Sequence, residues 1–368
     1  MFSTNYSDVL ELIDKIDPIA YGKTRNYIDG AVTKLSPYIS RGVISTKMVA
    51  KTVLQKGYHP QQIESFLKEL AWRDYFQQVW IAKGNEINED LKQSQPDVNN
   101  NQISEAIATH TTGINAIDDA IKLLYEYGYM HNHVRMYTAS ACCNIAKSHW
   151  KLPAKWLYYH LLDADWASNA LSWQWVAGSF SSKKYFANQE NINRYCHTQQ
   201  QNTFLDVPYE AFEDIETPVN LLQLTELTFS TNLPQATSIQ INNDLPTCIY
   251  NFYNLDCSWM QDVKANRVLL LEPSFFAEYP ASEKSINFIL KLAENIQGIQ
   301  IFVGEFTELN NLINKQPIYF KEHPTCKHYQ GIEHQRDWMF DEVKGYFPSF
   351  FSYWKKCVNY LNKMVNQH

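Results

Sequence analysis

The sequence lacks any Cys-x-x-Cys pair, although its 368 residues include seven cysteines. Zinc ribbons and most iron–sulfur frameworks depend on that spacing, so neither kind of metal centre is expected. The cysteines are expected to be reduced thiols that mostly pack in the core, at positions 142, 143, 196, 248, 257, 326 and 357.

A secretory signal and a membrane span are also missing. The first residues, MFSTNYSDVLELIDKIDP, do not run from basic to apolar, and no apolar run approaches the roughly 20 residues of a membrane helix. A cytoplasmic protein without a membrane partner is therefore expected. With 45% apolar and 14% aromatic residues, the chain can form the cores of two ordinary domains.

An excess of positive charge is absent too, since the net charge is −7. Taken alone, this value argues against a nucleic-acid partner. The two halves differ, however. Residues 1–200 carry 20 Lys and Arg against 19 Asp and Glu, whereas residues 201–368 carry 12 against 20. The near-neutral first half can still present a local basic face to phosphates.

The pattern of apolar residues changes near residue 200. Before it, a 3.6-residue period predicts helices in STKMVAKTVLQKG, QIESFLKELAWRDYFQQVWIA, GINAIDDAIKLLYEYG, NHVRMYTASACCNIAKSHW and KWLYYHLLD. After it, β-rich runs begin at residues 247, 267, 299 and 318, and SEKSINFILKLAENI predicts a helix between the second and the third. Strands that alternate with a helix are typical of a parallel sheet.

We therefore expect a multi-domain α plus α/β protein, in which an all-α domain (1–200) precedes a smaller parallel-sheet α/β domain (241–368). Residues 201–240 are expected to be a linker, and SFFSYWKKCVNYLNKMV an amphipathic C-terminal helix. The polar stretch from Asn85 to Thr112 is expected to be one long exposed connection.

Two stretches of the first half combine hydroxyl, acidic, aromatic and basic residues. In TKLSPYISRG, Ser36 before Pro37 predicts an N-cap and a first helical residue, which suits an anion or simply starts a helix. In ELAWRDYF, Glu69, Trp72 and Arg73 share one helical face. An ordinary Glu–Arg pair beside core aromatic residues is the alternative there.

Two further stretches are richer in polar side chains. In MHNHVRM, Asn132, Arg135 and Met136 share a face, and Trp150 is expected to return to the direction of Asn132 about five helical turns later. The pair His131 and His133 lacks the i, i+4 spacing of a chelating helical pair, so no metal is expected there. In DADWASNALSWQW, acidic residues lie among three tryptophans, and buried acids need a ligand, a metal or a cation as partner.

In this order and spacing, TKLSPYISRG, ELAWRDYF, TGINAIDDAIKLLYEYGYMHNHVRMYTAS and DADWASNALSWQWVAG resemble the FAD-binding helical domain of the photolyase and cryptochrome family. The resemblance covers about residues 18–186. It implies a bound FAD. In that family the α/β domain normally precedes the flavin domain and often holds an antenna pigment, so the order here looks circularly permuted, and the sequence leaves the pigment unknown.

The resemblance implies that Asp163 pairs with Arg135 beside the flavin ring, that Asp165 bonds the flavin or ribityl edge, and that Asn169 faces flavin N5. Physical chemistry agrees, because a buried Asp needs a cation and an amide can serve N5 in either protonation state. A magnesium site at the two aspartates is the alternative. The positions that match those holding the phosphates and the adenine end are Tyr21, Arg25, Thr33, Leu35 (through its backbone), Ser36 and Arg73.

The resemblance also implies a pocket for a flipped-out cyclobutane pyrimidine dimer, formed by Glu69, Trp72, Asn132, Met136 and Trp175. The tryptophans would form apolar walls, and Glu69 and Asn132 would bond the base edges. Enzymes for the (6-4) photoproduct carry His at the positions of Asn132 and Met136. Light-excited reduced flavin would donate an electron to the dimer, and the electron would return to the flavin after the ring has split. The implied partner is UV-damaged DNA. Single-stranded DNA is favoured because the chain is only weakly basic. The protein is expected to be a monomer.

The sequence departs from the family in its chain of tryptophans, which usually has three members that photoreduce the flavin. Trp173 and Trp150 match the inner two, but no Trp lies near Asp97 or Val98. The alternative terminal donors are Trp156, Tyr158 and Tyr159.

Two other positions differ from bacterial dimer-repair enzymes, which commonly have Arg at His133 and Trp at Tyr129. Two functions are therefore compatible with the sequence: dimer repair, and cryptochrome-like blue-light sensing without repair. A flavin-free structural domain is a third, and it would leave Asp163 and Asp165 with too few partners.

Overall fold

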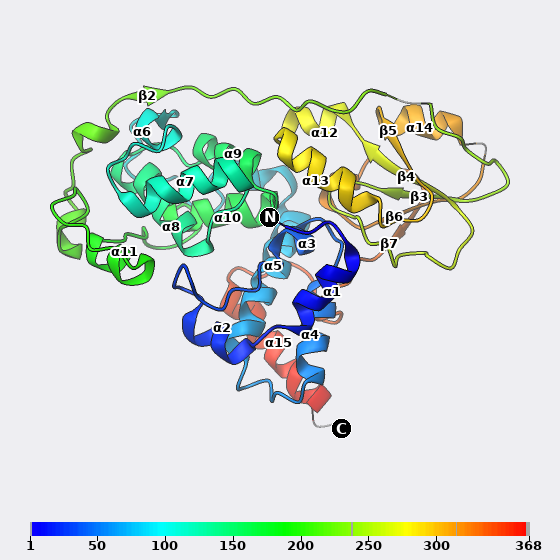
Figure 1. The fold of residues 1–368 in the computed structure, drawn as a ribbon, viewed down its shortest axis with the longest axis horizontal. Coiled ribbons are helices and arrows are strands. Elements are labelled where there is room, and N and C mark those ends of the chain that lie inside the picture. Colours follow the sequence, from blue (N-terminus) through cyan, green and yellow to red (C-terminus); the bar gives the residue numbers. More distant parts are fainter. Residues whose placement is uncertain (1, 237, 314, 366–368) are drawn as a thin grey trace. The chain divides into compact units, whose positions relative to one another are not determined.

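The computed structural model describes residues 2–236, 238–313 and 315–365 (Figure 1). The chain forms two compact units. Unit 1 takes the residues up to Pro18, Thr33–Ala82 and the residues from Ser230 onward, and unit 2 takes Ile19–Val32 and Lys83–Phe229. Within the described ranges, no helix has both the length and the apolar character needed to cross a membrane.

Unit 2 is built mostly of helices. They are α2 (Pro18–Thr24), α6 (Glu105–Ala108), α7 (Asn115–Tyr127), α8 (Asn132–Ser140), α9 (Lys151–His160), α10 (Trp166–Ala177) and α11 (Gln189–Cys196), with the short turns η1 (Gly84–Asn88), η3 (Tyr209–Phe212) and η4 (Val219–Leu221). The short strands β1 (Ile103–Ser104) and β2 (Leu224–Thr225) pair antiparallel. The helices predicted from periodicity at α7 and α9 are confirmed.

The prediction of one continuous helix from Asn132 to Trp150 is wrong. α8 ends at Ser140 and is followed by a single wide π-type turn, η2 (Ala141–Ile145). The Asn144 amide in that turn donates to the backbone carbonyls of Val176 and Tyr185, at 3.0 and 2.7 Å. These tertiary bonds override the local helical pattern, and Trp150 instead caps the start of α9.

The prediction of an exposed connection between Asn85 and Thr112 is also wrong. Ile87, Ile103 and Ile107 are fully buried, and the side chain of Gln95 is buried as well. The Gln95 amide donates to the carbonyl of Ser148 at 2.9 Å. A polar segment can be packed in this way where its buried side chains find hydrogen-bond partners, as Gln95 does.

Unit 1 joins helices from the N-terminal part of the chain to a sheet and helices from the C-terminal part. The helices are α1 (Tyr6–Asp14), α3 (Ser36–Ser40), α4 (Thr46–Gln55), α5 (Glu64–Lys83), α12 (Pro273–Glu278), α13 (Glu283–Ala293), α14 (Phe306–Leu312) and α15 (Phe350–Val365), with the turn η5 (Pro324–Cys326). The periodicity of α4, α5 and α13 and the aromatic pattern of α15 predicted these helices correctly.

The sheet of unit 1 is entirely parallel, as the sequence predicted. Its strands are β3 (Thr247–Tyr250), β4 (Asn266–Leu271), β5 (Ile299–Val303), β6 (Ile318–Lys321) and β7 (Ile332–His334), in the order β5-β4-β3-β6-β7. The strand β7 was not predicted, because three residues that are largely exposed carry no apolar pattern.

Side chains from both faces of the sheet are buried. Ile249, Val268 and Leu270 form one cluster with Phe306 and Leu309 of α14. The intervening residues of β3 and β4 point to the opposite face and are buried too, including Cys248, Leu269 and Leu271. Burial on both faces explains the nearly continuous apolar runs of these strands.

Helix α15 lies against α5 within unit 1. The ring of Phe350 stacks on Trp72, with 3.8 Å between centroids and 9° between planes, and the Trp354 indole donates to Glu64 at 3.0 Å. Between residues 201 and 240, the side chains of Leu205, Phe212 and Leu221 are buried within unit 2. The domain boundaries at 200 and 240, and the permuted domain order, stay predictions.

Candidate functional site

The predicted site residues fall into two groups, one in each unit. Unit 1 contains Thr33, Leu35, Ser36, Glu69, Trp72 and Arg73. Unit 2 contains Tyr21, Arg25, Asn132, Arg135, Met136, Trp150, Asp163, Asp165, Asn169, Trp173 and Trp175.

The centre of the unit 2 group is an ion pair between Arg135 and Asp163. Arg135 Nη2 donates to both carboxylate oxygens of Asp163, at 3.0 and 2.9 Å, and Arg135 Nε donates to the carbonyl of Met130 at 2.8 Å. The side chain of Asp163 is only 2% exposed and that of Arg135 is 20% exposed. A carboxylate this deeply buried is stabilised by the cation beside it, as the sequence predicted.

Asp165 has a local structural role that the sequence analysis missed. Its Oδ1 accepts a hydrogen bond from the backbone N–H of Ser168 at 2.7 Å and thereby caps α10. An Asp directly before an apolar helical pattern is an N-cap signal that could have been found. As for the magnesium alternative, both aspartates already accept protein N–H groups, and the described residues contain no group of three His, Cys, Asp or Glu placed to hold a metal.

Asn169, one residue further along α10, is held in one orientation. Its Nδ2 donates to the carbonyl of Ala154 at 2.8 Å, and a carbonyl can only accept, so the amide oxygen points elsewhere. The buried hydroxyl of the preceding Ser168 has no hydrogen-bond partner among the described residues. A buried hydroxyl without a partner next to Asn169, in the same unit as the buried Arg135–Asp163 pair, fits a polar, hydrogen-bonding cofactor such as a flavin.

Arg25 and Arg135 lie near two histidines, His131 and His133, whose pKa values are lowered. Burial, together with the charges of His133 and Arg135, lowers the pKa of His131 to about 4. Burial and the nearby Arg25 lower the pKa of His133. At neutral pH, Arg25 and Arg135 therefore provide the positive charge near the start of α8, as an anionic ligand requires.

The three tryptophans of α10 differ in exposure. Trp166 and Trp173 are buried at 1% and 2%, whereas Trp175 is 39% exposed and packs at 5.9 Å from the ring of Tyr185. On α8, Asn132 is exposed and Met136 is half-buried. The residues predicted to meet a substrate in unit 2 are therefore accessible to one.

Trp150, predicted to carry electrons with Trp173, is fully buried, and its indole N–H donates to Asp90 at 2.8 Å. The sequence analysis missed Asp90 because it lies in the stretch that was taken to be exposed. Of the alternative terminal donors, Trp156 and Tyr158 are buried, whereas Tyr159 is half-buried.

In unit 1, the expected N-cap at Ser36 is wrong by one residue. Helix α3 begins at Ser36 itself, and Leu35 precedes it as a cap without a side-chain bond. The hydroxyl of Thr33 accepts from the N–H of Leu35 at 3.4 Å, so the chain turns before the helix starts. Arg73 of α5 donates to the hydroxyl of Ser40 at 2.9 Å, which holds its guanidinium against α3.

The stacking of Phe350 on Trp72 is the contact of unit 1 that the sequence analysis missed. Trp72 and Glu69 are both half-buried on α5, and Phe350 is only 3% exposed. The two rings are nearly parallel, so Phe350 fixes the plane of the Trp72 ring. Nothing local in the sequence signals a partner 278 residues away.

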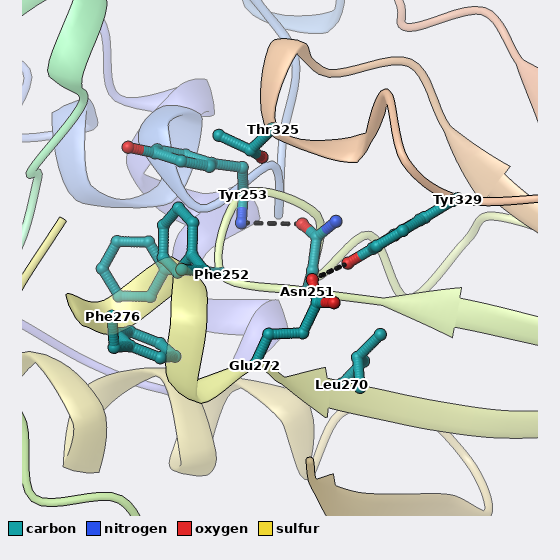
Figure 2. Close-up of a pocket in the computed structure, with 9 residues that line it drawn as sticks. Asn251, Phe252, Tyr253, Leu270, Glu272, Phe276, Thr325 and Tyr329 are labelled. Carbon is teal, nitrogen blue, oxygen red and sulfur yellow. Dashed lines mark hydrogen bonds between the residues drawn. The ribbon is translucent and has the colours of Figure 1, made fainter. Parts of the chain in front are cut away.

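A second feature lies at the carboxyl edge of the sheet in unit 1 (Figure 2). Glu272 is buried there and accepts hydrogen bonds from the Phe306 N–H, from His328 and from the Tyr329 hydroxyl, at 2.9, 2.8 and 3.0 Å. The cavity beside it has a volume of about 10 Å³, which is room for about one water molecule. An antenna pigment remains unassigned.

Residues 66–208 match the family model for the FAD binding domain of DNA photolyase. The chain is 32% identical over 231 residues to the deoxyribodipyrimidine photo-lyase of Agrobacterium fabrum, covering 55% of this chain and 48% of that protein. It is 30% identical over 148 residues to the deoxyribodipyrimidine photo-lyase of Alkalihalophilus pseudofirmus, covering 39% of this chain and 31% of that protein.

A third relative is the chloroplastic/mitochondrial cryptochrome DASH of Ostreococcus tauri, 32% identical over 194 residues, which cover 50% of this chain and 34% of that protein. Among solved structures, a Synechocystis cryptochrome is 24% identical with a TM-score of 0.47, covering 53% of this chain and 44% of that one. The chain spans about a third to a half of the length of these curated relatives.

These matches define the class of protein, because the matched part of the chain is an FAD-binding flavoprotein domain. Residues 66–208 therefore belong to the photolyase/cryptochrome family.

Proposed function

We propose that this protein is a DNA photolyase that splits cyclobutane pyrimidine dimers with light. The observation that carries this proposal is the exposure of Trp175, because it is the accessible tryptophan of α10 and stands where the family resemblance expects an apolar wall of the dimer pocket. An exposed indole is a stacking surface for a base.

The other residues proposed for the pocket have matching properties. Phe350 covers one face of the Trp72 ring, and the accessible part of that ring is available to a base. Glu69 and Asn132 offer hydrogen bonds to base edges, and Met136 offers an apolar contact. The absence of His at the positions of Asn132 and Met136 favours cyclobutane dimers over (6-4) lesions.

Within unit 2, Arg135, Asp163, Asp165 and Asn169 are proposed to hold the flavin ring and its ribityl edge. Bound FAD in its reduced, light-excited form supplies one electron to the dimer and takes it back after the ring has split. Because Asn169 Nδ2 is engaged by Ala154, its oxygen is the atom proposed to accept from a flavin N–H. The phosphates and the adenine end are proposed to bind Tyr21, Arg25, Thr33, Leu35, Ser36 and Arg73.

The test is repair of an oligonucleotide that carries one cyclobutane thymine dimer, under blue light with a reductant. We expect thymines to be restored, no change in the dark, and no change in an oligonucleotide with a (6-4) lesion. Single-stranded substrate is expected to be preferred, because a base without a partner strand costs less to flip out. Absence of repair by fully reduced, FAD-loaded protein would refute the proposal.

A matched pair of variants connects the assay to Trp175. Trp175→Ala is expected to weaken dimer binding by about 5- to 150-fold, which corresponds to about 1–3 kcal/mol for a lost stacking surface. Trp175→Phe keeps an aromatic ring and is expected to bind nearly as wild type. The FAD content of both variants should equal that of the wild type.

The second candidate is a blue-light receptor without repair. His133 and Tyr129 favour it, because both differ from the residues common in bacterial dimer-repair enzymes. Light-dependent reduction of bound FAD without repair of either lesion would support this second function.

A further inference from the structure

The buried indole of Trp150 has a charged hydrogen-bond partner, unlike the buried indoles of Trp156 and Trp166. Its N–H donates to a carboxylate oxygen, Asp90 Oδ1, at 2.8 Å. The indole N–H groups of Trp156 and Trp166, also buried in unit 2, donate to the neutral oxygens of Tyr125 and Asn88. A buried indole needs an acceptor, but a neutral one satisfies it.

The carboxylate is held in place by its own surroundings. Asp90 Oδ2 accepts from the backbone N–H of Gln95 at 2.8 Å, and Oδ1 lies 3.3 Å from Nε2 of His149. The side chain of Gln95 in turn accepts from the backbone N–H of Trp150 at 2.9 Å. Hydrogen bonds through Gln95 therefore connect the segment of Asp90 to that of Trp150, and His149 is the titratable group that faces the carboxylate.

This geometry matters once Trp150 has lost an electron. A neutral indole is a very weak acid, but its radical cation releases the N–H proton readily. A base that already accepts this hydrogen bond is within the distance needed for proton transfer. A neutral indole radical that has lost its proton takes back an electron slowly, because the proton must return as well.

We propose that Asp90 is the proton acceptor of Trp150 during light-driven electron transfer, an inference that rests on the electron path through Trp173 and Trp150 in the proposed function. Light-excited oxidised flavin takes one electron from Trp173, and Trp173 takes one from Trp150. The N–H bond of Trp150 then breaks, its proton forms an O–H bond with Asp90 Oδ1, and a neutral radical remains on Trp150.

The proposal explains how a chain of two tryptophans can work. The family's outermost tryptophan is missing near Asp97, and Trp150 is fully buried, so the positive charge cannot be stabilised by solvent. Transfer of the proton to Asp90 neutralises the charge on Trp150 without a surface residue. The carboxylate thus stabilises the charge separation by accepting a proton, while the unpaired electron stays on Trp150.

The test is transient absorption of the FAD-loaded full chain after a laser flash. In the wild type, the band of the tryptophan radical cation should give way to that of the neutral radical, more slowly in D₂O than in H₂O. In Asp90→Asn the cation should live about 100-fold longer, because the base is gone. The control Glu89→Gln changes the neighbouring acid, which bonds Lys151 and is 72% exposed, and should behave as wild type.

Two further measurements separate the possible failures. If Trp150→Phe leaves photoreduction unchanged, the electron path of the proposed function is wrong. If Trp150→Phe abolishes photoreduction while Asp90→Asn keeps wild-type radical kinetics, the role of Asp90 alone is refuted. Should Asp90→Asn fail to fold, the absence of a D₂O effect in the wild type would refute it equally well.

The hydrogen bond itself can be tested without light. In the ¹⁵N–¹H spectrum of the full chain, the indole resonance assigned by its loss in Trp150→Phe should move upfield in Asp90→Asn and stay in place in Glu89→Gln. An unmoved resonance in Asp90→Asn would overturn the proposal.

Discussion

The stack of Phe350 on Trp72 predicts a large difference between two neighbouring phenylalanines of α15. Phe350 is 3% exposed, whereas Phe351 is 71% exposed. Replacing each by Ala changes helix propensity equally, so the difference between the variants reports packing alone. The comparison therefore isolates the contact that ties the C-terminal helix to α5.

The magnitude follows from the burial of the ring. A buried Phe removes about 150–250 Å² from water, which at about 25 cal/mol per Å² is worth about 4–6 kcal/mol, and Phe→Ala changes in cores cost about 3–5 kcal/mol. We expect Phe350→Ala to lower the free energy of unfolding by about 3–5 kcal/mol. Phe351→Ala should change it by less than about 0.5 kcal/mol, as exposed positions usually do.

The assay is urea unfolding of the cofactor-free chain, followed by circular dichroism and by tryptophan fluorescence. Phe350→Leu, which keeps much of the apolar volume, should recover part of the lost stability. Equal destabilisation by the two alanine variants, or a loss below about 1 kcal/mol in Phe350→Ala, would refute the packing of α15 on α5 described above.

Three other predictions concern groups inside the units. Asp163→Asn leaves the Arg135 cation without its carboxylate and should lower the free energy of unfolding by about 3 kcal/mol and reduce FAD content, whereas Arg135→Met added to it should restore part of that stability; a neutral effect of the single change would contradict the ion pair. Burial raises the pKa of Asp74 to about 6, so the folded state holds a proton that the unfolded chain releases above about pH 4. Its contribution to stability is complete below pH 4 and is lost as the pH rises through 6, so the unfolding free energy of wild type minus that of Asp74→Asn should fall by about 3 kcal/mol between pH 4 and 7, and a flat difference would contradict the burial. Trp173→Phe should slow photoreduction sharply at unchanged FAD content, and normal kinetics would mean another electron route.

Much of this protein follows from local sequence patterns. The helices α4, α5, α7 and α13 and the strands β3 to β6 were predicted, because the periods of helices and strands depend on residues a few positions apart. The pairing of Asp163 with Arg135 was expected from motifs in register, and the structure contains that ion pair. A buried acidic residue such as Asp163 needs a cation, and the sequence shows this need even though it does not locate the cation.

Only the tertiary structure decided which partners meet. Asp90 reaches Trp150 across 60 residues and Phe350 reaches Trp72 across 278, and neither pairing leaves a trace in local periodicity. The break after α8 and the burial of Gln95 likewise depend on bonds to distant backbone groups, which satisfy polar atoms where the local pattern predicts a helix or an exposed loop. Local sequence patterns determined most of the helices and strands, whereas long-range packing and hydrogen bonding decided where α8 ends and which side chains contact Trp72 and Trp150.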